Sequence, residues 1–279
     1  MTILRGVPDA EAGEAGAAYG QPCTWLVTIA YDGTGLVGWQ RQAEGVSVQG
    51  LLEEALRPLE DGRVAVTGAG RTDAGVHALG QRASFELRRQ VPADVLCRAL
   101  NARLPPQVRV LAAEARARGF NARFDARRKT YRYLIDAGPV ADPFAARWAW
   151  HVPRRLEVDT MQAALAEILG THDFAAFRSA GSDVETTVRT VTGASCRLAA
   201  AGSGTAATPM LPLNPRIAIE VSGDGFLRHM VRAIVGTIVE IGQRQRPADD
   251  LGRVLASRDR RRAGATAPAQ GLCLVDVSY

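Results

Sequence analysis

The stretch GAGRTDAGVHALG, residues 68–80, places four glycines around a single carboxylate, Asp73. Apolar and polar positions alternate before it in residues 63–70 (RVAVTGAG) and after it in residues 80–87 (GQRASFEL). Such alternation is typical of strands, so we expect a strand, a loop that carries Asp73, and a second strand. Glycine accepts positive φ angles and lets the backbone approach a bulky ligand closely, which suits a loop at a binding site.

Several kinds of chemistry use glycine-rich loops. The sequence argues against a phosphate-binding P-loop, because that motif requires Gly-Lys-Ser/Thr at the start of a helix, whereas this loop has no lysine and leads into a strand. Asp73 and His77 are a weak candidate pair of metal ligands, since no further ligand follows nearby. Arg71 is two residues before Asp73, so in extended backbone both side chains point the same way. A guanidinium favours the ionised, nucleophilic carboxylate, but a plain turn closed by an Asp–Arg hydrogen bond explains the same residues.

Length and composition set the broad class of the protein. The 279 residues suffice for two modest domains, and 47% hydrophobic residues suffice to build cores. No apolar run reaches the roughly 20 residues of a membrane span, and residues 1–21 lack the pattern of a secretory signal. We expect these first residues to form a disordered tail. The cysteines are scattered without the spacing of a disulfide framework or a zinc site, which indicates a cytoplasmic protein; they are Cys23, Cys97, Cys196 and Cys273.

The net charge of +5 favours a polyanionic partner, and RNA or DNA is the leading candidate. Lys129 is the only lysine, so every other basic residue in the Lys+Arg total is an arginine. Arginine presents a planar fork that matches phosphate and stacks on bases, although a GC-rich coding bias explains the same ratio.

Strands and helices interleave along the whole chain. Strands are expected at 23–33, 63–70, 80–87, 108–117, 128–137, 187–198, 215–225 and 271–279, and helices at 47–59 (with Ser47 as N-cap), 92–105, 159–170 and 226–243. Since several strand pairs are close enough for hairpins, we expect an α+β fold of two domains, 22–118 and 119–279. Each is predicted to have a mainly antiparallel sheet flanked by helices, with the active-site cleft between them. Residues 199–214 are predicted to form a hairpin insertion without a catalytic part.

The order of motifs along the chain resembles that of the TruA-type tRNA pseudouridine synthases. Their hallmark is a GRTDAGVH segment like residues 70–77. The resemblance runs from about residue 23 to the last residue and includes YDGTGLVGWQRQ (31–42), SVQGLLEEAL (47–56), NARLP (101–105), FNARFDARRKTYRY (120–133), DFAAFR (173–178), GFLRHMVRAIVG (225–236) and GLCLVDVSY (271–279). So many motifs in order make the resemblance specific, and it implies the pseudouridine synthase fold.

The resemblance implies an isomerase that converts uridine to pseudouridine at positions 38–40 of the tRNA anticodon arm. It also implies a homodimer that uses no metal and no organic cofactor. Asp73 corresponds to the family's catalytic nucleophile, and Arg232 to an arginine that pairs with it. Tyr131 corresponds to a tyrosine that packs on the target base and is a candidate general base for the C5 proton. Arg71 corresponds to an arginine that takes part in flipping the uridine out of its stack, a step that costs a few kcal/mol.

Other candidate RNA contacts come from the residues themselves. A continuous helix over 226–243 places Arg228 and Arg232 on one face, and we expect Arg228 to meet phosphate rather than Asp73. The further candidates are Gln40, Arg41, Gln42, Arg127 and Arg128, although a solvated basic face gives the same pattern. On this strand Tyr133 is expected to fill the core. The alternative function is a non-catalytic RNA-binding protein of the same fold, which the basic charge supports equally well.

Overall fold

The structure is a computed structural model that describes residues 19–60, 62–179, 185–199 and 213–279. The strands are β1 Tyr19–Tyr31, β2 Thr67–Gly68, β3 His77–Arg89, β4 Val108–Arg116, β5 Arg128–Ala137, β6 Trp150–Val152, β7 Gly170–Asp173, β8 Val188–Leu198, β9 Arg216–Gly223 and β10 Leu272–Ser278. The α-helices are α1 Val48–Leu56, α2 Ala93–Asn101, α3 Val158–Leu165, α4 Met230–Gly242 and α5 Asp250–Ser257. Within the described ranges, the strands form one ten-stranded sheet of order β4-β1-β3-β10-β5-β9-β8-β7, with β2 paired to β3 and β6 paired to β5.

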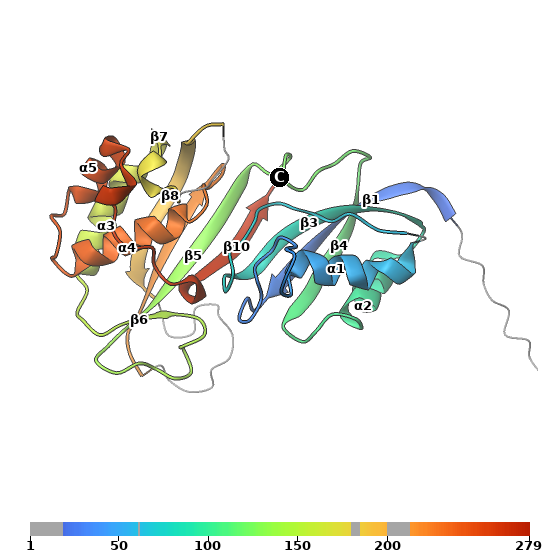
Figure 1. Cartoon of the computed structure of the whole chain (residues 1–279), viewed down its shortest axis with the longest axis horizontal. Helices are drawn as coiled ribbons and strands as arrows, with labels where there is room; N and C mark the ends of the chain where they lie inside the picture. The colour runs from blue at the N-terminus through green and yellow to red at the C-terminus, as the bar shows by residue number, and fades with distance from the viewer. Residues whose placement is uncertain (1–18, 61, 180–184, 200–212) are drawn as a thin grey trace, which may run out of the picture.

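The last strand, β10, joins the two halves of the molecule into this single sheet (Figure 1). It runs parallel to β3 of the first half and antiparallel to β5 of the second. The buried hydrophobic side chains form one cluster that reaches from Leu26 of β1 to Val221 of β9. The expectation of a separate sheet in each half is therefore wrong, whereas the α+β class and the mostly antiparallel pairing are confirmed. The error has a physical cause, because no local pattern shows that a C-terminal strand will pair between two distant ones.

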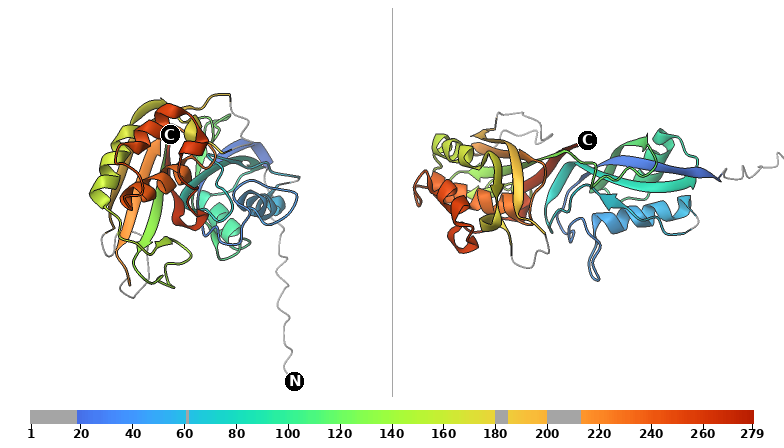
Figure 2. Two further views of the ribbon diagram at one scale, coloured as in Figure 1. Left: turned by 60° about the vertical axis from the view of Figure 1, so that its left-hand side comes forward. Right: turned by 90° about the horizontal axis from the view of Figure 1, so that it is seen from above.

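The helices divide between the two halves. α1 and α2 pack against each other and α2 packs on β4, while α3, α4 and α5 pack together and α3 lies on β8. Figure 2 shows both groups from two further directions, and they remain on opposite ends of the sheet. The division of the chain near residue 118 stays a prediction. That position lies between β4 and β5, just before Gly119, which has a φ of +86°.

Most predicted elements are present, with shifted ends. The strand 128–137 has the expected bounds, and Ser47 caps α1 by accepting the Gly50 N–H at 3.2 Å. β1 begins at Tyr19, inside the predicted tail. The rest of the tail, residues 1–18, and residues 200–212 of the predicted insertion lie outside the described residues. The short elements β6, β7 and α5 were not predicted, since they span too few residues to show a clear period.

The helix predicted over 226–243 begins only at Met230. The preceding residue, His229, has φ 63° and ψ 2°, which is a left-handed conformation that no right-handed helix includes. Arg228 therefore precedes the helix, and the premise that Arg228 and Arg232 share one helix face is wrong. Among the described residues, no helix is long and apolar enough to cross a membrane.

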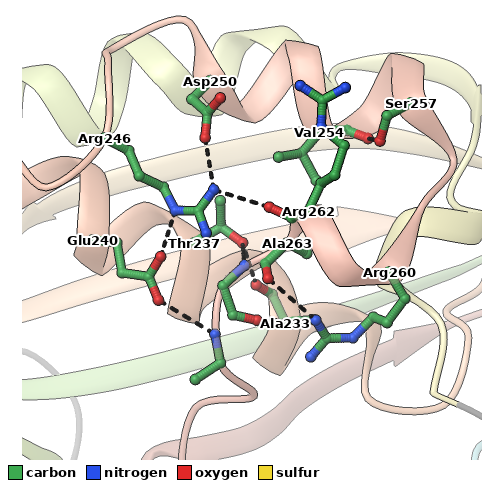
Figure 3. A network of polar contacts seen from close by, with 12 residues as sticks. Ala233, Thr237, Glu240, Arg246, Asp250, Val254, Ser257, Arg260, Arg262 and Ala263 are labelled. Atoms are coloured by element: carbon green, nitrogen blue, oxygen red, sulfur yellow. Dashed lines mark hydrogen bonds and ion pairs between the residues drawn. The ribbon is translucent and has the colours of Figure 1, made fainter.

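A network of charged and polar groups holds α4 against α5 and against the segment between α5 and β10. Figure 3 shows Arg246 at its centre, donating to the carboxylates of Glu240 and Asp250. Thr237 of α4 accepts the backbone N–H of Gly264 at 2.9 Å. The network therefore fixes the 263–268 segment alongside α4.

Candidate active site

Asp73 lies in the loop between β2 and β3, which packs tightly against the turn after β1. The backbone N–H of Trp39 donates to the Thr72 carbonyl at 3.0 Å. Gly38 has a φ of +101°, and a Cβ at this position would lie 2.4 Å from the same Thr72 oxygen. Only glycine fits both the conformation and the space. Two motifs that the sequence shows separately thus form one packed unit around the aspartate.

Buried polar side chains hold the backbone just before Asp73. The hydroxyls of Tyr31 and Thr72 share a hydrogen bond of 2.7 Å. Gln81 donates to the Gly70 carbonyl at 2.8 Å. Burial raises the pKa of Tyr31, so this phenol stays protonated and serves as a neutral hydrogen-bonding group. The carboxylate therefore projects from a loop whose backbone has little freedom.

Three basic groups at the start of α4 surround the Asp73 carboxylate. Arg232 places Nη1 3.4 Å from Oδ2, and its Nε donates to the Ala267 carbonyl at 2.7 Å. His229 places Nε2 3.4 Å from the same Oδ2. Arg228 places Nε 4.0 Å from Oδ1. The side chain of Arg232 is 14% exposed and that of Arg228 is 57% exposed, so Arg232 is the better desolvated and the stronger partner.

The contact of Arg228 with the carboxylate differs from the sequence-based expectation. Arg228 was expected to meet phosphate rather than Asp73, and the structure places it next to Asp73. The geometry arises because the left-handed residue after Arg228 turns the chain back toward the loop. Its exposed guanidinium still leaves donors free for a phosphate.

His229 is a residue of the site that the sequence reasoning missed. Burial lowers its pKa, while the charge of Asp73 raises it. With the pKa lowered on balance from 6.5, the ring is mostly neutral at pH 7 and its Nε2 can donate a hydrogen bond to Asp73. The available signal was its position, since it lies between the two arginines of the LRHMVR segment.

Tyr131 reaches the same site through the sheet. Leu274 of β10 pairs with Tyr131 on one side and with Ala78 on the other, which places the tyrosine in the row of residues just after the Asp73 loop. Its ring meets the edge of Phe226 at 5.2 Å between centroids, and the residue is 7% exposed. Burial raises the pKa of Tyr131. On the same strand, Tyr133 is fully buried, which confirms its expected place in the core.

The structure does not assemble the Asp73–His77 pair that a metal ion would need. Nδ1 of His77 accepts the Gly33 N–H at 3.0 Å, and Nε2 lies 3.1 Å from the Gln270 carbonyl. Burial lowers the pKa of His77, which fits a neutral ring with both nitrogens engaged. Across the described ranges, no three His, Cys, Asp or Glu side chains come together in a way that would hold a metal ion.

Arg71 is exposed and forms no ion pair with Asp73 within the part of the chain that the structure describes. The cations around the carboxylate come from α4 and from Arg228 just before it. The remaining candidates, Gln40, Arg41, Gln42 and Arg128, are all exposed, and Arg41 lies 3.6 Å from Glu53. None of these side chains has an ion pair or hydrogen bond with Asp73 among the described residues.

The carboxylate thus lies where the loop of the first half meets the start of α4 in the second. A hollow of about 580 Å³ lies elsewhere, against β1, β3 and residues 119–121, and neither Asp73 nor Arg232 lines it. The junction, and not this hollow, holds the convergent polar groups.

Comparison with known proteins shows which family the chain belongs to. The sequence profile described as tRNA pseudouridine synthase matches residues 27–125 and 164–279, which include Asp73 and Arg232. The chain belongs to the tRNA pseudouridine synthase family. Membership in this family makes it an isomerase. Tyr131 lies between the two matched ranges.

Relatives match this member of the family over almost their whole length. A protein described as tRNA pseudouridine synthase A from Moorella thermoacetica is 44% identical over 260 residues, covering 92% of this chain and 100% of that protein. One of the same description from Syntrophotalea carbinolica is 42% identical over 251 residues, covering 90% and 94%. A solved structure of an unknown protein from Galdieria sulphuraria is 13% identical over 81% of this chain and 94% of that one, with a TM-score of 0.20, which is too low to indicate a shared fold.

Proposed function

We propose that this synthase isomerises uridine to pseudouridine at positions 38–40 of the tRNA anticodon arm, with Asp73 as the nucleophile. The observation that carries the proposal is the set of contacts around one carboxylate. Arg232 and His229 both approach Oδ2 at 3.4 Å, on an aspartate whose loop is fixed by close backbone packing. A site that only binds RNA gains nothing from a negative charge among its cations.

The reaction breaks the bond between uracil N1 and ribose C1′ and forms a bond between C5 and C1′. N1 gains a proton and C5 loses one, so no redox partner or co-substrate is required. An ionised carboxylate that adds to the sugar or the ring and later leaves divides this reaction into easier steps. Arg232 places its guanidinium 3.4 Å from the Asp73 carboxylate, and its bond to the Ala267 carbonyl keeps the guanidinium in place.

Tyr131 is proposed to stack on the target base and to accept the C5 proton. Its flat ring lies against Phe226, and its hydroxyl lies near the loop that carries Asp73. Because burial raises the pKa of Tyr131, the hydroxyl is protonated in the free protein. Its role as a base therefore requires that proton to leave after the substrate has bound.

The rest of the proposal concerns RNA binding. Arg71 is exposed and free to enter the base stack during flipping, while Arg228, Arg128, Arg41, Gln40 and Gln42 are proposed to contact the RNA backbone. The family resemblance supports a homodimer in the cytoplasm that uses neither a metal nor an organic cofactor.

Tritium release tests the chemistry directly. A tRNA transcript with tritium at C5 of its uridines is incubated with the protein in excess EDTA, and release to water is counted. We expect release by the native protein and a loss of at least about a thousandfold in Asp73→Asn, as is typical when a nucleophile is removed. The affinity for tRNA should change less than about threefold, because phosphate contacts dominate binding.

The alternative, a non-catalytic RNA-binding protein of the same fold, predicts a different result. The native protein would bind tRNA in a salt-dependent way and release no tritium, and Asp73→Asn would behave the same. Near-native release by Asp73→Asn would instead show that another residue is the nucleophile. Equal thermal melting of the two proteins is the control for folding.

A further inference from the structure

Lys129 is the only lysine of the chain, and it lies beside the site. It is two residues before Tyr131 on β5, so both side chains project from the same face of the sheet. A Cβ at Gly70 would lie 3.8 Å from Cδ and from Nζ of Lys129, and also 3.8 Å from the Tyr131 hydroxyl. The ammonium and the phenol therefore both reach the glycine three residues before Asp73.

This lysine has cations for neighbours and no acidic partner in contact. Within the described ranges it forms no ion pair and no side-chain hydrogen bond. Burial is the main cause that lowers the pKa of Lys129, and the charges of Arg123 and Arg189 lower it further. Asp224 acts in the opposite direction but is not within ion-pair distance.

The two neighbouring arginines also lack carboxylate partners among the described residues. Among these residues the Arg189 side chain donates only to the carbonyls of Thr186 and Val188, and the Arg123 guanidinium carbon lies 5.4 Å from the centroid of the Phe124 ring. Lys129 and Arg189 are half-buried, and no acid lies within ion-pair distance of any of the three cations among the described residues. Positive groups gathered in this way form a site suited to an anion.

We propose that Lys129 binds the backbone phosphate adjacent to the target uridine, with Arg123 and Arg189 completing the positive site. The proposal rests on the proposed function, since the flipped nucleotide is what brings a phosphate to Tyr131. A compact ammonium suits this place because it binds phosphate as a point charge and needs no planar partner. The bound anion offsets the repulsion among the three cations, so the contact forms in the productive complex.

A double-mutant cycle tests the contact between protein and phosphate. The substrates are an anticodon stem-loop RNA and two copies with a neutral methylphosphonate, one on the 5′ side and one on the 3′ side of the target uridine. We expect Lys129→Met to lower kcat/KM about tenfold to a hundredfold, as for the loss of one hydrogen bond to a charged group. With the native protein, one of the two methylphosphonate RNAs should show a similar loss of kcat/KM. When Lys129→Met acts on that RNA, kcat/KM should fall no further than it does for the larger of the two single changes.

The matched control is Arg253→Gln, which removes one positive charge from the exposed face of α5. It should change kcat/KM less than about twofold, as expected for an exposed ion pair. Lys129→Arg keeps the charge and should recover most of the loss. The proposal would be overturned if the kcat/KM loss caused by Lys129→Met multiplied with the loss caused by each of the two methylphosphonates. It would also be overturned if Lys129→Met changed kcat/KM as little as Arg253→Gln.

The native protein provides a second measurement that needs no variant to fold. An amine-reactive ester modifies Lys129 as the only side-chain amine, and mass spectrometry of the peptide gives the rate. The stem-loop RNA should slow this reaction at least about fivefold, and the critical methylphosphonate RNA should protect much less. Equal protection by all RNAs would overturn the proposal. Failure of the proposed function is seen separately, as absence of tritium release by the native protein.

Discussion

The loop after β2 and the start of α4 meet at Asp73, yet they are held in place by different forces. The loop depends on close backbone packing, with Gly38 placed against the Thr72 carbonyl. The start of α4 depends on polar contacts. Arg232 donates to the Ala267 carbonyl, and the segment that contains Ala267, between α5 and β10, is held by the Arg246 network. Packing at van der Waals distance tolerates no added atom, whereas charged contacts adjust and respond to pH. Asp73, the proposed nucleophile, thus lies on the side held by packing, which we call the rigid side, and its cations lie on the side held by polar contacts, the adjustable side.

The largest effect on stability should come from adding one methyl group to the rigid side. Gly38→Ala places a Cβ 2.4 Å from the Thr72 oxygen at a φ of +101°. We expect the free energy of unfolding to fall by about 3 kcal/mol or more, through the strain of the left-handed backbone and the clash. Urea titration measures this change.

Gly35→Ala is the matched control in the same turn. Gly35 also has a positive φ, +75°, but its Cβ would meet nothing within 4 Å. It should therefore cost only the backbone strain, about 1–2 kcal/mol. Equal losses for the two variants would show that the close approach to Thr72 does not hold the loop.

On the adjustable side, Arg232→Gln should affect activity more than stability. The substitution removes the more buried of the two arginines beside Asp73. We expect kcat to fall about a hundredfold, which is the usual cost of removing one group that stabilises charge in the transition state. The kcat of Arg232→Lys should lie between that of Arg232→Gln and that of the native protein, because lysine keeps the positive charge but lacks the planar guanidinium with its several N–H donors. Tritium release at saturating tRNA measures kcat, and a near-native Arg232→Gln would contradict the pairing with Asp73.

The smallest effect that we expect is a dependence of the free energy of unfolding on pH. On the rigid side, His77 contributes to this dependence. Burial lowers the pKa of His77 from 6.5 in the folded protein. Below pH 6.5 the unfolded chain binds more protons than the folded one, so stability is present above this pH and falls as the pH decreases. His229 has a lowered pKa and the same sign.

His77→Gln should reduce this pH dependence. The variant is less stable at pH 7, since it loses the contacts to Gly33 and Gln270. Its free energy of unfolding should nevertheless decrease less steeply between pH 6.5 and 5 than that of the native protein. Urea titrations at several pH values measure the slope, and identical slopes would assign the dependence to other groups.

Local patterns predicted those parts of the fold that depend on neighbouring residues. The strand 128–137 and the Ser47 cap follow from alternation and from one side chain that meets the backbone three residues on. The start of α4 was not predicted, because the left-handed conformation of His229 does not alter the helical spacing of the apolar residues around it. The single sheet did not follow either, since β10 pairs with strands that lie far away in the sequence.

The sequence by itself determined the family and the aspartate proposed as the nucleophile. These are properties of short strings, since GRTDAGVH and the motifs around it can be read without knowing what they contact. The family resemblance also indicated that Arg232 pairs with Asp73. Only the tertiary structure decided that Arg228 and His229 approach the same carboxylate while Arg71 is exposed. It also decided that Lys129 shares a site with Tyr131 and Gly70. The physical reason is that these side chains are brought together by the pairing of distant strands and by burial. The spacing of apolar residues along a short segment determines neither of the two.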